Sequence, residues 1–237
     1  MAENNSVELW NKVLKTSMNI PFVKVDRSAF LEKELAKFCT PMEVISAIND
    51  SPVEVLSKKE IDKLANQCIN YHLTMVCGTS ALMGLPGGWW MAGTIPTDLT
   101  QFYGHILSLA QKLMYLYGWP SLTDAQNQFD DESLNILTLF VGAMMGSKAA
   151  VEALSKVVVS VSKNAGVRIS ETVIAAYTIK IAQWIGVNMT KESFAKGMGK
   201  VLPIVGAPIS ATITYYTFKP MARRLKKHLD ELYDMRH

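Results

Sequence analysis

Charged side chains are scarce in this sequence: only 19% of its 237 residues are Asp, Glu, Lys or Arg, and the net charge is +3. A nucleic-acid-binding domain normally shows a concentrated basic face with aromatic or amide side chains nearby. We therefore expect no nucleic acid as a partner. Hydrophobic residues make up 49% of the chain. So much apolar surface can offset the entropy lost on ordering, which argues against intrinsic disorder.

Cysteine is also rare, and an export signal is missing. The three cysteines, Cys39, Cys68 and Cys77, are an odd number without CxxC spacing. The N-terminal residues place acids before bases and contain no apolar run of about seven residues, so we expect no signal peptide. We expect reduced, buried thiols in a chain made in the cytosol. Its expected location is the cytoplasm or the inner face of the cell membrane, as a peripheral protein.

The sequence lacks the familiar motifs of catalytic and phosphate-binding sites. It contains neither GxSxG nor HExxH. Residues 142–148 look superficially like a phosphate loop, but they lack the GxxxxGK[ST] spacing and a preceding strand, so the backbone cradle cannot form. We expect no cofactor and favour a role other than catalysis, while an enzyme stays an open alternative.

Sequence patterns typical of helix ends occur along the whole chain. Thr40, Ser51 and Ser57 are each followed three residues later by Glu, and the first two also by Pro, as at capped helix N-termini. Gly118, followed by Trp119 and a proline, predicts a helix end. The predicted helices cover residues 6–18, 28–38, 41–49, 52–56, 58–83, 97–117, 131–146, 148–163, 169–185, 191–200 and a last segment after 203. We predict an all-α fold, with residues 1–25 as an N-terminal helix and 26–237 as one multi-helix domain.

One long segment carries no charge. Between Lys63 and Asp98 lie 34 residues without Asp, Glu, Lys or Arg. A bilayer span needs about 20 predominantly apolar residues, but polar side chains are spread through the first half of this segment, and Gly-Leu-Pro-Gly-Gly at 84–88 interrupts the second half. We therefore predict a buried, glycine-containing helical hairpin in place of a membrane span.

The terminal helix has an apolar stripe and a basic face. The stripe consists of Met221, Leu225, Leu229 and Leu232, and the basic residues are Arg223, Arg224, Lys226 and Lys227. Basic amphipathic helices can lie in a lipid interface. Acids at 230, 231 and 234 dilute the basic face, so packing of the stripe on the core is the favoured interpretation and membrane contact is the alternative.

Several residues could carry chemistry. Asp98 closes the uncharged segment, either as a carboxylate that faces a pocket with His72, Tyr103 or His105, or, as we favour, as a first-turn residue that stabilises a helix start. Cys68 lies four residues before His72, but a zinc site needs further ligands and this spacing is common, so we expect no metal. The adjacent tryptophans at 89 and 90 fit either a membrane interface or a packing role.

The order of these turn and packing residues resembles a known family. Glycines at 78, 84, 87, 88 and 93, prolines at 86 and 96, Asp98, and a helix ending at 115–120 resemble the EcsC protein family, bacterial proteins first noted beside genes of an ABC exporter. The likeness starts near residue 25 and extends through residues 196–206. A looser likeness is to the helical membrane-associated domains that accompany some GTPases. The resemblance implies an all-helical fold in a bacterial cytoplasmic or membrane-associated setting, and it supplies no catalytic residues.

Three functions are compatible with these features. The favoured one is an EcsC-like accessory protein that binds membrane lipid or a membrane protein complex. The alternatives are a membrane-perturbing effector or immunity-type protein, and a lipid- or small-molecule-binding module or enzyme with an apolar pocket near Asp98. The candidate functional residues are Gly84, Pro86, Gly87, Gly88, Trp89, Trp90, Pro96, Asp98 and His72.

Overall fold

The computed structural model describes residues 2–83, 97–124, 126, 128–163, 171–189 and 208–235. This described part of the chain contains helices and no strands, so the all-α prediction is confirmed. The helices are α1 (Ala2–Met18), α2 (Arg27–Leu35), α3 (Pro41–Asn49), α4 (Pro52–Val55), α5 (Lys58–Met83), α6 (Thr97–Leu116), α7 (Asp131–Met145), α8 (Lys148–Lys163), α9 (Glu171–Asn188) and α11 (Pro208–Asp234). The predicted helix at 191–200 and the hairpin turn at 84–96 lie outside the described residues.

Two of the three predicted N-terminal caps make the full set of capping hydrogen bonds. Thr40 and Ser57 each accept a hydrogen bond from the amide of the glutamate three residues later, and their own amides donate to that glutamate's carboxylate. Ser51 also occupies the predicted N-cap position, with a proline at N1 of α4, but its side chain makes no capping hydrogen bond. Its hydroxyl faces Gly118 instead, where an added Cβ would lie 2.4 Å from the Ser51 Oγ.

Glycines end two of the central helices. Gly118 has a φ of 79° and Gly146 a φ of 99°, both in the left-handed region that favours glycine. After α6, the amides of Gly118 and Trp119 donate to the carbonyls of residues 115 and 114. This hydrogen-bond pattern satisfies the last carbonyls of the helix, as the sequence predicts for Gly118.

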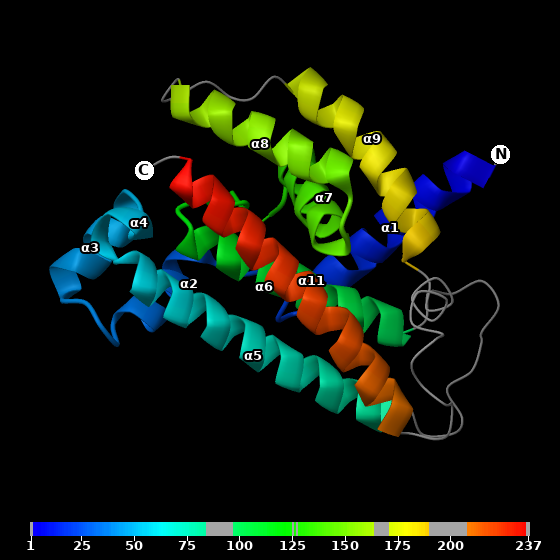
Figure 1. Ribbon diagram of the computed structural model, residues 1–237, viewed down its shortest axis with the longest axis horizontal. Coiled ribbons are helices and arrows are strands. Elements are labelled where there is room, and N and C mark those ends of the chain that lie inside the picture. The colour runs from blue at the N-terminus through cyan, green and yellow to red at the C-terminus, as the bar shows by residue number, and fades with distance from the viewer. Residues whose placement is uncertain are drawn as a thin grey trace.

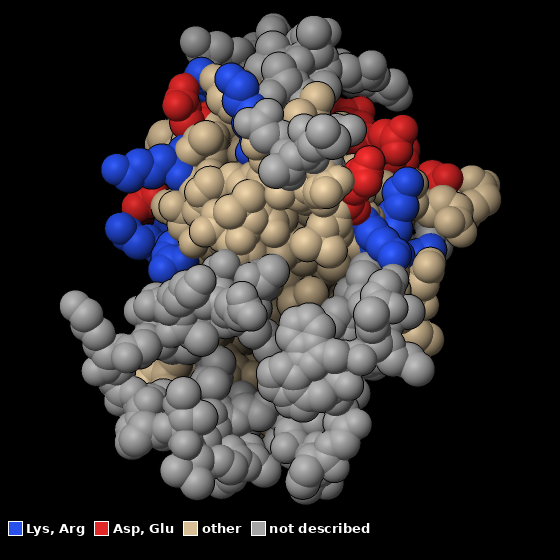
Figure 2. Space-filling model, turned by 90° about the vertical axis from the view of Figure 1, so that its right-hand side faces the viewer, with Lys and Arg blue, Asp and Glu red and all other residues tan. Residues whose placement is uncertain are grey.

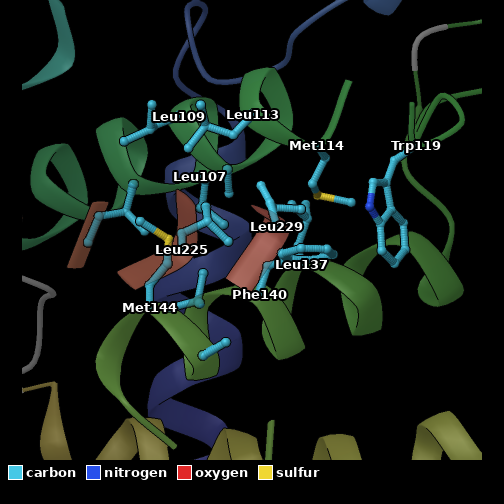
Figure 3. Packing of buried hydrophobic residues seen from close by; sticks show 14 of the residues in the cluster. Leu107, Leu109, Leu113, Met114, Trp119, Leu137, Phe140, Met144, Leu225 and Leu229 are labelled. Atoms are coloured by element: carbon cyan, nitrogen blue, oxygen red, sulfur yellow. The ribbon is translucent and has the colours of Figure 1, made fainter. Parts of the chain in front are cut away.

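Helix α6 forms the centre of the bundle. It packs against α1, α2, α5, α7 and α11, and it lies between α1 and the α5–α11 pair in Figure 1. Its inward side chains meet those of α7 and α11 in a layer that Figure 3 shows from close by. Nearly every side chain from Tyr103 to Tyr117 is buried. A polar side chain on this part of α6 therefore lies inside the bundle unless it is long enough to reach the surface.

Helix α1 shares this core. Trp10 is fully buried, and its indole Nε1 donates to the Thr138 hydroxyl of α7 at 3.1 Å. The Ser17 hydroxyl donates to the carbonyl of Thr100 at 3.1 Å. The first helix is therefore fixed to the centre of the bundle by both apolar burial and hydrogen bonds.

The terminal helix packs its stripe on the core. Met221, Leu225, Leu229 and Leu232 are all buried against the rest of the bundle. The favoured interpretation of this helix is thereby confirmed, and its apolar stripe is not available to a lipid interface. Among the residues that the structure describes, no helix combines the length and the apolar character that a bilayer span requires.

Candidate functional site

The structure places the candidate residues unevenly. Gly84, Pro86, Gly87, Gly88, Trp89, Trp90 and Pro96 all lie outside the described residues. Asp98 lies in the first turn of α6, where the sequence places it, and its side chain is outside the described part. His72 is the one member of the set whose surroundings are fully described.

His72 meets a second buried histidine and a lysine. The Nδ1 atoms of His72 on α5 and His105 on α6 lie 3.2 Å apart. The Nζ of Lys112 lies 3.0 Å from the Nε2 of His72. His105 and Lys112 are seven residues apart, which is two helical turns, so both side chains project from one face of α6 toward α5. We call these three residues the His–Lys cluster.

The hydrogen bonds fix the ring protons of the cluster. A charged lysine has donors and no acceptor, so the Nε2 of His72 accepts from Lys112 and carries no proton. The proton of His72 is then on Nδ1 and is donated to the Nδ1 of His105. His105 in turn carries its proton on Nε2. The hydrogen bond from Lys112 to His72 and the one from His72 to His105 thus determine which ring nitrogen of each histidine carries the proton.

Burial keeps both imidazoles neutral. It lowers the pKa of His72 to about 2, with the charges of Lys112 and His105 as smaller causes. It lowers the pKa of His105 to about 4, again with a contribution from Lys112. Both rings are almost completely shielded from water. Near neutral pH the two rings therefore carry no charge and act as hydrogen-bond partners of each other and of Lys112.

Lys112 is a half-buried cation without a carboxylate partner. No Asp or Glu of the described chain lies within ion-pair distance of its Nζ. Burial lowers its pKa, the nearby Lys33 lowers it further, and Cys68 and Glu34 raise it. The Tyr71 ring lies 5.3 Å from the Nζ and offers the cation its π face.

Two exposed aromatic rings contact the cluster, and an exposed methionine lies nearby along α5. The Phe22 ring stacks on His105 with centroids 4.8 Å apart, and the Tyr71 ring meets His72 edge to face at 5.3 Å. Met75 follows Tyr71 one turn later on α5. Phe22, Tyr71 and Met75 are 42%, 56% and 43% exposed. We call these three residues the apolar rim.

The other residues weighed with Asp98 and His72 lie elsewhere or are inert. Tyr103 points away from the cluster, toward Trp10 and the Met145 sulfur, and burial raises its pKa. Burial raises the pKa of the Cys68 thiol to about 11, so it stays protonated and a poor metal ligand. The cysteines are free and partly buried. Within the described ranges, no three His, Cys, Asp or Glu residues are grouped to hold a metal ion.

Sequence reasoning singled out His72 and His105 but missed Lys112 and the rim. Two features of the sequence could have indicated this site. His105 and Lys112 are seven residues apart, on one face of a predicted helix, and Tyr71 directly precedes His72 in another. The spacing alone does not predict that Lys112 meets His72, because the way in which α5 packs on α6 decides which of their polar residues face each other.

The chain matches no family model, no curated protein and no solved structure. The resemblance to the EcsC family is neither supported nor contradicted by these comparisons.

Proposed function

We propose that this chain is an EcsC-like interaction protein that associates with the cytoplasmic face of a membrane, or with a membrane protein complex. The contact surface is the apolar rim together with the end of the bundle where α5 leads into residues 84–96. The observation that carries the proposal is the exposure of Phe22, Tyr71 and Met75, of which Tyr71 lies against the Lys112 cation.

The rim differs from apolar residues scattered singly on a surface. Its two aromatic rings are connected through His105 and His72 by a continuous series of ring contacts. Tyrosine and tryptophan favour the membrane–water interface, and a lysine there can place its charge among anionic headgroups. The sequence adds the tryptophans at 89 and 90 to the segment that α5 enters.

Helix α5 ends, and α6 and α11 begin, on the right-hand side of Figure 1. Figure 2 views that side: its lower part is drawn in grey, and the described surface above has few charged side chains at its centre and more at its flanks.

The terminal helix is not part of this contact surface. Its stripe is buried, and Lys226 is held by Asp62 at 2.6 Å and by Asp230 at 2.9 Å. The basic side chain of Lys226 is therefore already engaged within the chain, and the remaining basic residues alone provide no apolar anchor.

Flotation with anionic vesicles tests the proposal. We expect the full chain to float with vesicles of phosphatidylglycerol and phosphatidylcholine, and Phe22→Ser, Tyr71→Ser and Met75→Ser combined to reduce the floating fraction several-fold. The matched control is Met42→Ser with Ile45→Ser, which removes two exposed apolar residues from α3 and should float like the unchanged chain.

Further measurements and outcomes complete the flotation experiment. Failure of the unchanged chain to float at low salt contradicts direct membrane binding, as does equal flotation of the rim and control variants. Trp89→Ser with Trp90→Ser tests the segment that the sequence singles out. Release of a trapped dye from the vesicles would favour the membrane-perturbing alternative over a peripheral accessory protein.

A further inference from the structure

We propose that the outer side of α3 is a docking surface for a basic amphipathic helix of a protein partner. This surface consists of Phe38, Met42 and Ile45, and we call it the α3 face. It lies at the opposite end of the bundle from the point where α5 leads into residues 84–96: α3 is at the left of Figure 1, and α5 ends at the right. A protein partner at this end is a second interaction, beyond the proposed membrane contact.

Helix α3 carries apolar side chains on both of its sides. Val44 and Ala47 are buried in the core, and the helix packs on α2 and α4. Met42 and Ile45 are three residues apart, on the other side of the helix, and are 75% and 52% exposed. A surface helix normally turns polar residues away from the core, and a helix that is apolar all round is normally covered. The composition of α3 therefore favours a partner packed on its outer side.

A third exposed apolar side chain extends this surface. Phe38 lies in the turn before α3, four residues before Met42, and is 39% exposed. The Nζ of Lys63 lies 5.0 Å from the centroid of its ring. Three exposed large apolar side chains thus come from eight consecutive residues, 38–45. Grouped apolar residues of this kind mark interaction surfaces, whereas single scattered ones are normal on any protein.

The charges around the α3 face determine the kind of partner. From residue 38 to residue 57 the chain contains Glu43, Asp50 and Glu54 but no Lys or Arg. All three acids are exposed, and none of them forms an ion pair within the part of the chain that the structure describes. Hydrogen bonds from Thr40 lower the pKa of Glu43, so this carboxylate is ionised near neutral pH.

The lysines nearest to this acidic stretch in the sequence are engaged by other acids. Lys37 contacts Glu34 at 2.6 Å, and Lys58 contacts Asp62 at 2.8 Å. Opposite charges around an apolar centre favour association and exclude partners of the wrong charge. A helix with large apolar side chains on one side and Lys or Arg at its flanks therefore complements the α3 face. An anionic lipid surface, or the acidic α3 face of a second copy, does not.

Binding of a synthetic peptide to the full chain tests the proposal. The probe is a fluorescein-labelled peptide of about 18 residues, long enough to form a helix in water, with leucine at helical spacing and lysine elsewhere. We expect fluorescence anisotropy to detect binding, and Met42→Ser with Ile45→Ser to weaken it at least about tenfold. Asp50→Asn with Glu54→Gln should weaken it several-fold and reduce its dependence on salt.

Matched controls separate the α3 face from the apolar rim. Phe22→Ser, Tyr71→Ser and Met75→Ser combined should bind the peptide as the unchanged chain does. Met42→Ser with Ile45→Ser should lose the peptide but still float with vesicles. A peptide with glutamate in place of lysine should bind at least about tenfold more weakly, because its charge repels the acids around α3. Circular dichroism and the Tm show that each variant is folded.

The proposal is overturned if the unchanged chain does not bind the lysine peptide, or if Met42→Ser with Ile45→Ser binds it equally well. It is also overturned if sedimentation shows a dimer that this variant dissociates, because a second copy would then cover the α3 face. None of these results depends on vesicle binding, so the failure of this proposal and the failure of the proposed function are distinguishable.

Discussion

The Nζ of Lys112 donates to the Nε2 of His72 across 3.0 Å, and this pair joins α6 to α5. A buried ammonium is usually stabilised by a carboxylate. Here its partner is a neutral imidazole whose other nitrogen is occupied by His105. Through this pair, the partly buried amine of Lys112, the two neutral histidines and the apolar rim form a single site.

Acid should destabilise the protein through the buried histidines. Folding lowers the pKa of His105 to about 4 and that of His72 to about 2, from about 6.5 in the unfolded chain. Between the folded and unfolded pKa values the unfolded state binds more protons. Stability is therefore complete above about pH 6.5 and falls as the pH drops, by up to about 1.4 kcal/mol per pH unit for each histidine.

Urea unfolding at pH 7, 6 and 5 measures this slope. His105→Gln should reduce the loss between pH 6.5 and 5, because one buried imidazole is gone. An unchanged pH slope for His105→Gln would show that the buried pair does not govern acid stability.

Two glycine substitutions should act in opposite directions. A Cβ at residue 142 would lie 2.6 Å from the Ile181 Cγ2 and 2.9 Å from the Ala150 Cβ, whereas a Cβ at residue 78 meets nothing within 4 Å. We expect Gly142→Ala to cost about 1–3 kcal/mol through overpacking, and Gly78→Ala in α5 to stabilise by about 0.5–1 kcal/mol. Thermal unfolding would contradict this packing if both variants shifted the Tm the same way.

The first helix should be essential to the core. Trp10 is fully buried and hydrogen-bonded to Thr138, so Trp10→Ala should cost about 3–5 kcal/mol. Lys12→Ala, on the exposed side of the same helix, should change stability by less than about 0.5 kcal/mol. A chain that begins at residue 26 should lose cooperative unfolding. If that truncated chain unfolds cooperatively, residues 26–237 form an independent domain.

Two neighbouring lysines of α11 should differ in their contribution. Lys226 bridges Asp62 and Asp230, with its side chain 16% exposed, whereas Lys227 contacts Glu231 at 3.4 Å and is mostly solvated. Lys226→Met should cost up to about 1 kcal/mol, because partial exposure of the two aspartates screens the pairs. Lys227→Met should be close to neutral. Chemical denaturation at low and high salt measures both, and high salt should narrow the difference.

Local chemistry explains why most helix bounds could be predicted. The capping residues Thr40 and Ser57 and the glycine at 118 act through neighbours within a few positions along the chain, so their effect is readable from the sequence. Ser51 has the same local pattern and stands at the N-cap of α4, but its side chain makes no capping hydrogen bond, and its Oγ lies beside Gly118 of a distant helix end. The local pattern therefore predicted its position but not its hydrogen bond.

The candidate site was predicted only in part, for the same reason. His72 and His105 stand out as histidines within apolar helices, but nothing in their spacing pairs them with each other or with Lys112. That pairing depends on the offset at which α5 packs on α6. The exposure of Phe22 and Tyr71 likewise depends on which neighbours cover them.

The sequence by itself determined the all-α class, most helix bounds and the burial of the terminal stripe, because hydrophobic periodicity and capping act over one or two helical turns. Tertiary structure alone decided that Lys112 meets His72, that α1 is fixed to the core by Trp10, and that an apolar rim stays exposed beside a half-buried amine. These features arise from the packing of helices that are distant along the chain, and packing offset is not encoded in any single segment.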